Sequence, residues 1–248
     1  MVETRAHGRL SLTHPGETPR PAALLWHYAE NGEALRRVRR EYSGWRPEAL
    51  GAHGLTAATI VDVGAATGTP DLYRSFPDAH LVLVDPLVEH ERPLRNWADR
   101  RGEYHLLALG ERQGTLTMNV LERALGMSSA LTSIIDRTRE EPVSRQVDVT
   151  TLDALYEQRR WAPPFGLKID TEGYEDRVLK GARRTLAETQ FVIAEVSVAR
   201  RFEGGHSFAQ LIALLDEAGF ALTDVLDGLK WSHSGEMIFM DALFRRCD

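Results

Sequence analysis

Three carboxylates follow a short apolar run closely enough to take part in acid–base chemistry. Residues 167–169 have the composition of a buried strand, and Asp170, Glu172 and Glu175 come just after them. Open α/β sheets bind their ligands at the carboxyl ends of the strands. Because Asp170 ends the strand itself, we predict that it is a general base or anchors a hydroxyl of a bound substrate. For Glu172 and Glu175 a simpler interpretation is equally open, in which both cap the following helix.

Two further residues that can carry a proton lie downstream. Glu195 lies near the end of the next apolar run, residues 191–196, so its carboxylate would converge with Asp170 and Glu172 and help to shape a pocket. His206 lies in a glycine-containing loop, where it is either a proton-transfer residue or a solvated surface residue. Convergent carboxylates also hold hard divalent cations. A magnesium ion that polarises an oxygen of the substrate is therefore an alternative, although no residue is assigned as a metal ligand.

A second group of residues has the features of a cofactor site. The apolar run 60–63 contains Asp62, and the turn from Gly64 to Gly68 consists of small residues that allow a ligand to approach the backbone. Asp85 follows the next apolar run, 81–84, where a carboxylate can accept the ribose hydroxyls of an adenosine. Nicotinamide dehydrogenases share both features, but their G-x-G-x-x-G turn needs a central glycine for the pyrophosphate, and this chain has Ala66. S-adenosylmethionine has no phosphate, so the pattern favours that cofactor over a nicotinamide, while a turn without any ligand is the plain structural alternative.

These residues must be positioned by alternating strands and helices. Besides the runs already named, residues 104–109, 114–120 and 147–149 have strand character, and helices are expected around residues 72–76, after Tyr174 and over residues 207–217, the last ending at Gly219. Residues 221–225 and 237–244 are expected to close the sheet as an antiparallel hairpin. The order predicts an α/β fold with a doubly wound, mainly parallel sheet. Ser128 and Ser129 lie in the insertion after residues 104–109, where they either touch a ligand or form a turn.

Length and composition limit the class of protein. A chain of 248 residues with 43% hydrophobic and 27% charged residues can build one large core. We expect an N-terminal arm and helical cap over residues 1–50, with a helix over residues 22–42, and a catalytic domain over residues 51–248. Aromatic residues of the cap either pack in the core or, alternatively, cover the pocket for the substrate.

The expected environment follows from charge and cysteine content. Cys247 is the single cysteine, so an intramolecular disulfide is impossible, which fits a reducing compartment and a cytoplasmic protein. The net charge of −6 argues against a nucleic-acid partner, and no apolar run is long enough for a membrane span. The sequence gives no indication of the oligomeric state.

Taken together, the motifs resemble those of the FkbM-type family of S-adenosylmethionine-dependent methyltransferases. The resemblance covers residues 60–196 and is carried by these segments: Asp62-Val63-Gly64-Ala65, Val84-Asp85-Pro86, Ala108-Leu109-Gly110, Thr151-Leu152-Asp153, Lys168-Ile169-Asp170-Thr171-Glu172-Gly173, Val178-Leu179-Lys180-Gly181-Ala182, and Glu195. It implies a seven-stranded class I methyltransferase fold and O-methylation of a hydroxyl on a sugar, polyketide or other small metabolite.

The resemblance also implies roles for single residues. Asp62, Gly64 and Gly68, with Ala65 between them, would hold the methionine end of the cofactor. Asp85 and the adjacent Pro86 would hold the ribose, and Ala108 would flank the adenine. The chain departs from the family pattern at Ala66, usually asparagine, and at Asp85, commonly glutamate. N-methylation, carboxylate methylation, a nicotinamide-dependent oxidoreductase and a non-catalytic cofactor-binding relative remain alternative functions.

Overall fold

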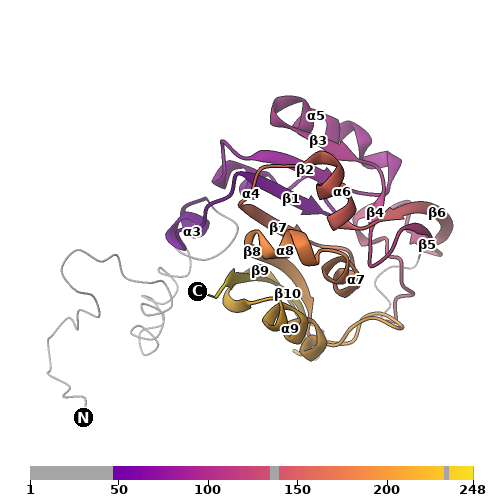
Figure 1. Ribbon diagram of the computed structural model, residues 1–248. Helices are drawn as coiled ribbons and strands as arrows, with labels where there is room; N and C mark the ends of the chain where they lie inside the picture. The colour runs from indigo at the N-terminus through magenta and orange to yellow at the C-terminus, as the bar shows by residue number, and fades with distance from the viewer. Residues whose placement is uncertain (1–46, 135–139, 232–234, 248) are drawn as a thin grey trace, which may run out of the picture.

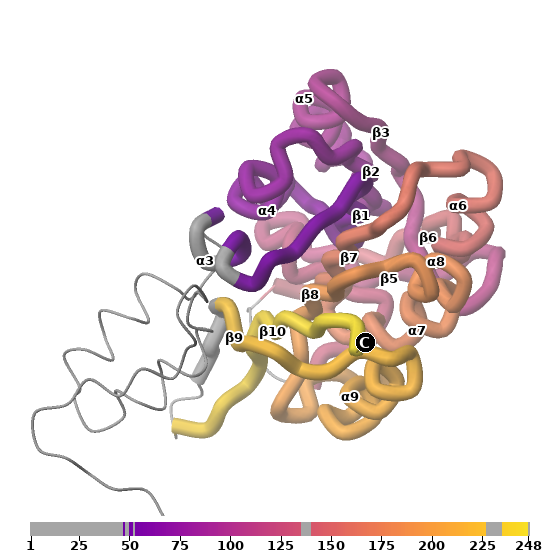
Figure 2. The backbone as a smooth tube through the Cα atoms, turned by 60° about the vertical axis from the view of Figure 1, so that its left-hand side comes forward, coloured from indigo at the N-terminus to yellow at the C-terminus, as the bar shows by residue number. Residues whose placement is uncertain are grey.

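Seven strands form the central sheet of the computed structural model, which describes residues 47–134, 140–231 and 235–247. From edge to edge the order is β3 (Gly102–His105), β2 (His80–Val84), β1 (Thr59–Val63), β7 (Phe165–Ile169), β8 (Thr189–Ser197), β10 (Met237–Arg246) and β9 (Phe220–Trp231). The first five are parallel, and β10 runs antiparallel to both β8 and β9. Figure 2 shows β3 and the β9–β10 hairpin at opposite ends of the sheet. The predicted doubly wound sheet with its C-terminal hairpin is confirmed.

Helices cover both faces of this sheet (Figure 1). They are α3 (Pro47–Ala52), α4 (Pro70–Ser75), α5 (Glu91–Arg101), α6 (Leu152–Arg159), α7 (Glu175–Lys180), α8 (Arg183–Ala187) and α9 (Phe208–Glu217). Side chains alternate along a strand, so Val61 and Val63 pack with α6 to α9, whereas Ile60 packs with α3 to α5. The sheet is therefore buried on both sides, which explains the nearly continuous apolar runs in its parallel strands.

A smaller sheet lies beyond the carboxyl end of β1 (Figure 1). Its order is β4 (Ala108–Leu109), β6 (Val143–Thr150) and β5 (Gly114–Val120), and β5 runs antiparallel to β6. The run 104–109, expected as one strand, is thus divided between the two sheets. Its partner β2 ends at Val84, opposite His105, so the residues that follow have no neighbour in the central sheet and Ala108 and Leu109 pair with β6 instead.

Glycines and caps set the helix ends. Ser207 and Gln210 form a capping box at the start of α9, and Gly219 follows its end with a φ of +84°. The helix expected after Tyr174 is instead the two short helices α7 and α8. Between them Gly181 packs so closely on Gly110 that an added Cβ would lie 2.1 Å from the carbonyl oxygen of Gly110.

Some expectations fall outside the described residues. The helix expected over residues 22–42 does so entirely, and the boundary between cap and catalytic domain stays a prediction. Within the described ranges, no helix combines the length and the apolar character that crossing a bilayer requires.

Candidate functional site

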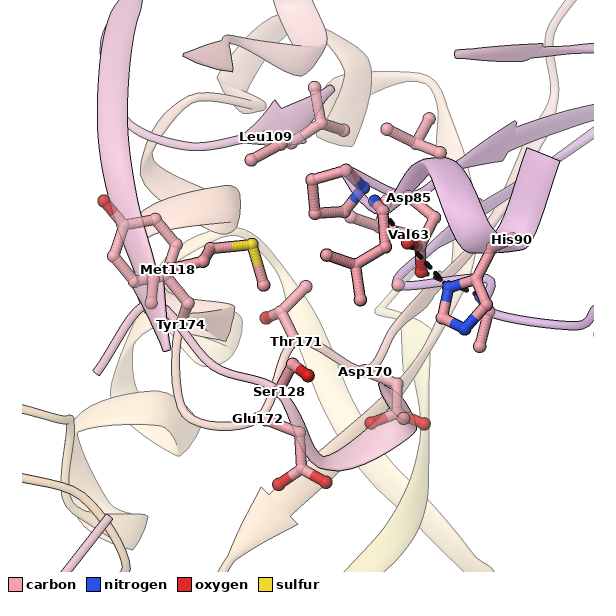
Figure 3. A pocket seen from close by; sticks show the side chains of 18 of the residues that line it. Val63, Asp85, His90, Leu109, Met118, Ser128, Asp170, Thr171, Glu172 and Tyr174 are labelled. Carbon is pink, nitrogen blue, oxygen red and sulfur yellow. Dashed lines mark hydrogen bonds and ion pairs between the residues drawn. The ribbon is translucent and has the colours of Figure 1, made fainter. Parts of the chain in front are cut away.

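A cavity opens at the carboxyl ends of β1, β2 and β7, beneath the small sheet (Figure 3). It has about 720 Å³ of empty space, counted with its open mouth. Its walls come from four stretches of chain: residues 63–66, residues 84–90, residues 107–130 and residues 170–174. Figure 3 shows apolar side chains such as Leu109 and Met118 on one side and the carboxylates of Asp170 and Glu172 on the other.

The turn after β1 brings two strand ends into contact. Gly64 donates its backbone N–H to the carbonyl of Val84 at 2.9 Å, and Asp170 donates its own to the carbonyl of Val63 at 2.9 Å. Gly64 has a φ of +73°, and a Cβ there would lie 1.8 Å from the carbonyl oxygen of Asp170. Only glycine fits this position. The turn and Asp170 therefore hold fixed positions relative to each other.

Asp85 accepts three hydrogen bonds at the wall of the cavity. Its Oδ2 accepts from the backbone N–H of Ala66, and its Oδ1 accepts from the N–H of Leu87 and from Nδ1 of His90, all at 2.9 Å. The bond to Asp85 outweighs burial and raises the pKa of His90 above its ordinary value. Ala66 has a φ of +46°, a left-handed conformation that asparagine and glycine adopt more readily than alanine. His90 is absent from the sequence-based prediction.

Asp62 lies behind the turn and does not line the cavity. It is fully buried, and its Oδ2 accepts from Oγ1 of Thr69 at 2.8 Å and from the hydroxyl of Tyr73 at 2.5 Å. Nζ of Lys168 forms an ion pair with Oδ1 at 3.2 Å. Burial, reinforced by the charge of Asp62, raises the pKa of Tyr73. Burial lowers the pKa of Lys168, but the carboxylates of Asp62 and Asp170 outweigh it, so the net direction is upward.

The seven residues expected to bind the cofactor thus fall into two groups. Gly64, Asp85, Pro86 and Ala108 line the cavity. Asp62, Ala65 and Gly68 do not line it: Asp62 is buried behind the turn, and Ala65 and Gly68 belong to the turn itself. Gly68 has a φ of +99° and packs against Trp97, with no room for a Cβ between them.

Asp170 lies on the opposite wall with one carboxylate oxygen available. Its side chain is 36% exposed, and Oδ2 pairs with Nζ of Lys168 at 3.4 Å. Oδ1 has no partner among the residues that the structure describes. A carboxylate oxygen in this position can accept a proton or a hydrogen bond from a bound molecule.

Glu172 and Glu195 are brought together by a buried arginine. The side chain of Arg201 is completely buried and donates to Oε2 of Glu172 at 3.2 Å, to Oε1 of Glu195, and to Oγ of Ser197 at 2.9 Å. Glu172 lines the cavity, but Glu195 does not. Burial, together with the charges of Asp170 and Glu172, raises the pKa of Glu195 well above its ordinary value despite Arg201. In the sequence nothing distinguishes Arg201 from its neighbour Arg200, and the prediction missed it.

His206 lies outside the cavity and contacts the loop that carries Glu172. Its Nε2 donates to Oε2 of Glu175 at 2.8 Å, and both side chains are almost fully buried. Oε1 of Glu175 accepts from the backbone N–H groups of Thr171 and Gly173, each at 3.0 Å, and from the Thr171 hydroxyl. Burial would raise the pKa of Glu175, but His206 and these donors lower it, while Glu175 raises that of His206 against the effect of burial. In this arrangement His206 supports the loop from outside the cavity, and its expected role in proton transfer stays a prediction.

The segment after β5 closes the cavity from above. Ser128 lines the cavity, and its Oγ accepts from the backbone N–H of Leu121 at 3.0 Å. Ser129 donates its hydroxyl to the carbonyl of Glu172 at 2.7 Å. The segment is thereby attached to the loop that carries Glu172. Of the two serines, Ser129 contacts this loop, whereas Ser128 faces the cavity.

The acidic groups do not form a ready metal site in the described part of the chain. No three His, Cys, Asp or Glu side chains there are arranged to hold an ion. Between Glu172 and Glu195 the guanidinium of Arg201 supplies the positive charge. Magnesium therefore stays an untested alternative, and activity after chelation would test it.

Comparison with known proteins identifies the family. The profile described as the methyltransferase FkbM domain matches residues 62–222, which is more than half of the chain and includes every residue that lines the cavity. The chain belongs to the FkbM family of S-adenosylmethionine-dependent methyltransferases. No curated protein sequence is significantly similar to it.

Solved structures similar to this FkbM family member share little sequence with it. A methyltransferase FkbM from Methylobacillus flagellatus KT has 16% identity and a TM-score of 0.48, over 92% of this chain and 55% of its own. The 1,6-didemethyltoxoflavin-N1-methyltransferase from Burkholderia thailandensis has 15% identity and a TM-score of 0.43, over 96% and 94%. The magnesium protoporphyrin IX methyltransferase from Synechocystis PCC 6803 has 11% identity and a TM-score of 0.43, over 94% and 99%. Similarity at this level carries no information about the substrate.

The residues around the cavity fit the cofactor of the FkbM family. Leu87, Leu109 and Met118 offer an apolar surface suited to a purine base. Asp85 and His90 offer hydrogen-bonding groups suited to ribose hydroxyls, and Asp170 stands at the far end of the same space. A ligand with a purine base and a ribose matches these two surfaces.

Proposed function

We propose that this chain transfers the methyl group of S-adenosylmethionine to a hydroxyl of a small metabolite. The observation that carries the proposal is the difference between the three carboxylates of the cavity wall. Asp85 is held by three donors and Glu172 by Arg201, whereas Asp170 keeps an unpartnered oxygen with respect to the described residues. A hydroxyl acceptor needs such a group, because its proton must leave as the oxygen attacks.

Asp170 and its neighbours have separate roles in the proposed reaction. When bound, the cofactor would supply a methyl group on a sulfonium sulfur. As an oxygen lone pair of the acceptor attacks the methyl carbon, the sulfur would keep the electron pair of the carbon–sulfur bond and leave as a thioether. Asp170 aligns the acceptor hydroxyl and accepts its proton on Oδ1. Lys168, at 3.4 Å from Oδ2, and the turn at Gly64 hold this carboxylate in place. Alignment of the acceptor can supply several kcal/mol of the barrier reduction, in the range of about 7–11 kcal/mol known for well-oriented reactants.

Support for a hydroxyl acceptor comes from the same carboxylate. A primary or secondary amine must also lose a proton but can do so after methyl transfer, and a carboxylate acceptor needs no base at all. A positioned base is therefore most useful for an alcohol. The identity of the metabolite depends on the acceptor pocket beyond Asp170.

An acceptor screen tests the proposal. The purified chain is incubated with S-adenosylmethionine and pools of small molecules that carry hydroxyl, amine or carboxylic acid groups, and products are detected by mass spectrometry. We expect methylated products from hydroxyl compounds, with one S-adenosylhomocysteine released for each methyl transferred. Products from amines or acids alone would contradict methylation of a hydroxyl but not methyl transfer.

A further inference from the structure

Asp85 has little capacity left for a ribose. A carboxylate offers about four acceptor positions, and the donors Ala66, Leu87 and His90 use three of those on Asp85. One position on Oδ2 remains. A ribose presents two neighbouring hydroxyls, so Asp85 in this arrangement accepts from one of them and the other needs a different partner.

His90 is placed to be that partner. Its imidazole bonds to Oδ1 of Asp85 through Nδ1, and the residue lines the cavity while being only 5% exposed. Within the described part of the chain no group bonds to the other ring nitrogen, Nε2, and packing does not seal that atom. Because His90 lines the cavity, part of its small exposed surface faces that space. A ring nitrogen accepts from a hydroxyl when neutral and donates to its oxygen when protonated, so Nε2 can bond a hydroxyl in either state.

We propose that His90 is a cofactor-binding residue, whose Nε2 bonds one ribose hydroxyl of the adenosyl cofactor while Asp85 bonds the other. The inference rests on the proposed function, since it names a further contact in the same site. Asp85 has a shorter side chain than the glutamate that the family commonly has at this position. His90 compensates for the difference, because its ring holds a second polar atom beyond the carboxylate.

Two isosteric variants separate the roles of the two ring nitrogens. The amide of His90→Asn occupies the position of Nδ1 and keeps the bond to Asp85, but it has nothing at the position of Nε2. The amide of His90→Gln reaches the position of Nε2. His105→Asn is the matched control, since His105 pairs with Glu103 through a 3.0 Å contact, is also buried and does not line the cavity.

The probes are S-adenosylhomocysteine and its 2′-deoxy and 3′-deoxy analogues, with dissociation constants measured by isothermal titration calorimetry. For the wild-type protein and His105→Asn, we expect each deoxy analogue to bind about tenfold more weakly than S-adenosylhomocysteine. For His90→Asn, we expect S-adenosylhomocysteine itself to bind about tenfold more weakly and one of the two deoxy analogues to suffer no further loss. We expect His90→Gln to retain most of the wild-type pattern.

The possible failures are distinguishable. One outcome is that the wild-type protein binds S-adenosylhomocysteine and that His90→Asn still binds each deoxy analogue about tenfold more weakly than S-adenosylhomocysteine. In that case the assignment of His90 is wrong and the proposed function stands. If the wild-type protein binds none of the three probes, the proposed function fails and the assignment of His90 fails with it. Because His90→Asn and His90→Gln disturb the fold in different ways, melting temperatures of both confirm that the affinities refer to folded protein.

Discussion

At the scale of single residues, the carboxylates around the cavity differ through their partners. Glu172 and Glu195 share the guanidinium of Arg201, and Glu175 is enclosed by backbone donors and His206. Asp170 has one lysine neighbour and one available oxygen. Chemically similar side chains, close in sequence, therefore have different roles.

Asp170→Asn tests the assignment of the base. The amide keeps the size of the side chain but cannot accept the proton, so we expect the rate of methyl transfer to fall about 100- to 10,000-fold. Affinity for S-adenosylhomocysteine should change less than about threefold, since no cofactor contact is removed. Initial rates and calorimetry measure the two effects, with Asp99→Asn on the exposed side of α5 as control. A rate within a factor of about three of wild type would exclude Asp170 as the base.

Ala66 offers a test of backbone strain. A left-handed conformation costs a residue with a Cβ roughly 1–2 kcal/mol, and Ala66 has a φ of +46°. We therefore expect Ala66→Gly to raise the free energy of unfolding by about 1 kcal/mol in urea denaturation. The same change at Ala218, where φ is −81°, should lower it. Equal losses at both positions would show that the turn is not strained.

At the scale of elements, the loop between β7 and α7 is held in place from behind. Glu175 bonds two backbone N–H groups of the loop, and His206 connects it to the start of α9. Glu172 and Gly173 in this loop have positive φ angles, +52° and +97°, so the loop needs such support. Helix α9 thus helps to position the wall of the cavity without contributing to it.

The pair of Glu175 and His206 predicts a dependence of stability on pH. The pKa of His206 is raised in the folded state, mainly by Glu175 against the effect of burial, so its contribution is complete below the ordinary value of 6.5 and is lost as pH rises through the folded value. The pKa of Glu175 is lowered by His206 and backbone donors against burial, so its contribution is complete above 4.5 and is lost as pH falls through the folded value. The pair therefore stabilises the folded state most between about pH 4.5 and pH 6.5, where both contributions are complete.

His206→Gln measures this contribution. We expect a loss of about 2–3 kcal/mol in the free energy of unfolding near pH 5.5, because a buried carboxylate loses its cation. The difference from wild type should shrink as the pH rises above the folded pKa of His206. His105→Gln is the control, with an expected loss below about 1 kcal/mol, since its partner Glu103 is 30% exposed. A difference from wild type that does not vary with pH would refute a charged pair.

The elements also show what the sequence could predict. Residues that directly follow a strand were located correctly, because the apolar run fixes where the strand ends and which edge its last residue reaches. Gly64, Asp85 and Asp170 are of this kind, and all three line the cavity. Contacts of His90 and Arg201 depend on the path that the chain takes after a strand has ended, which local patterns do not encode. For the same reason the small sheet was not predicted as a separate unit.

At the scale of the whole molecule, the two sheets together make the site. The central sheet brings Asp85 and Asp170 to one edge, and the small sheet covers that edge with the apolar side chains of β4 and β5. The C-terminal hairpin contributes no lining residue among the described ones but completes the sheet next to β8. The match of the FkbM family to residues 62–222 includes both sheets except the start of β1, most of β9 and the last strand, β10.

The most direct test of the central claim is a melting-temperature series with S-adenosylmethionine, S-adenosylhomocysteine and NAD. A ligand at about 100 times its dissociation constant adds roughly 2.7 kcal/mol, which corresponds to about 5–10 °C for a chain of this size. We predict an increase of this size with both adenosyl compounds and none with NAD. No increase with either adenosyl compound, or an increase with NAD alone, would contradict the account.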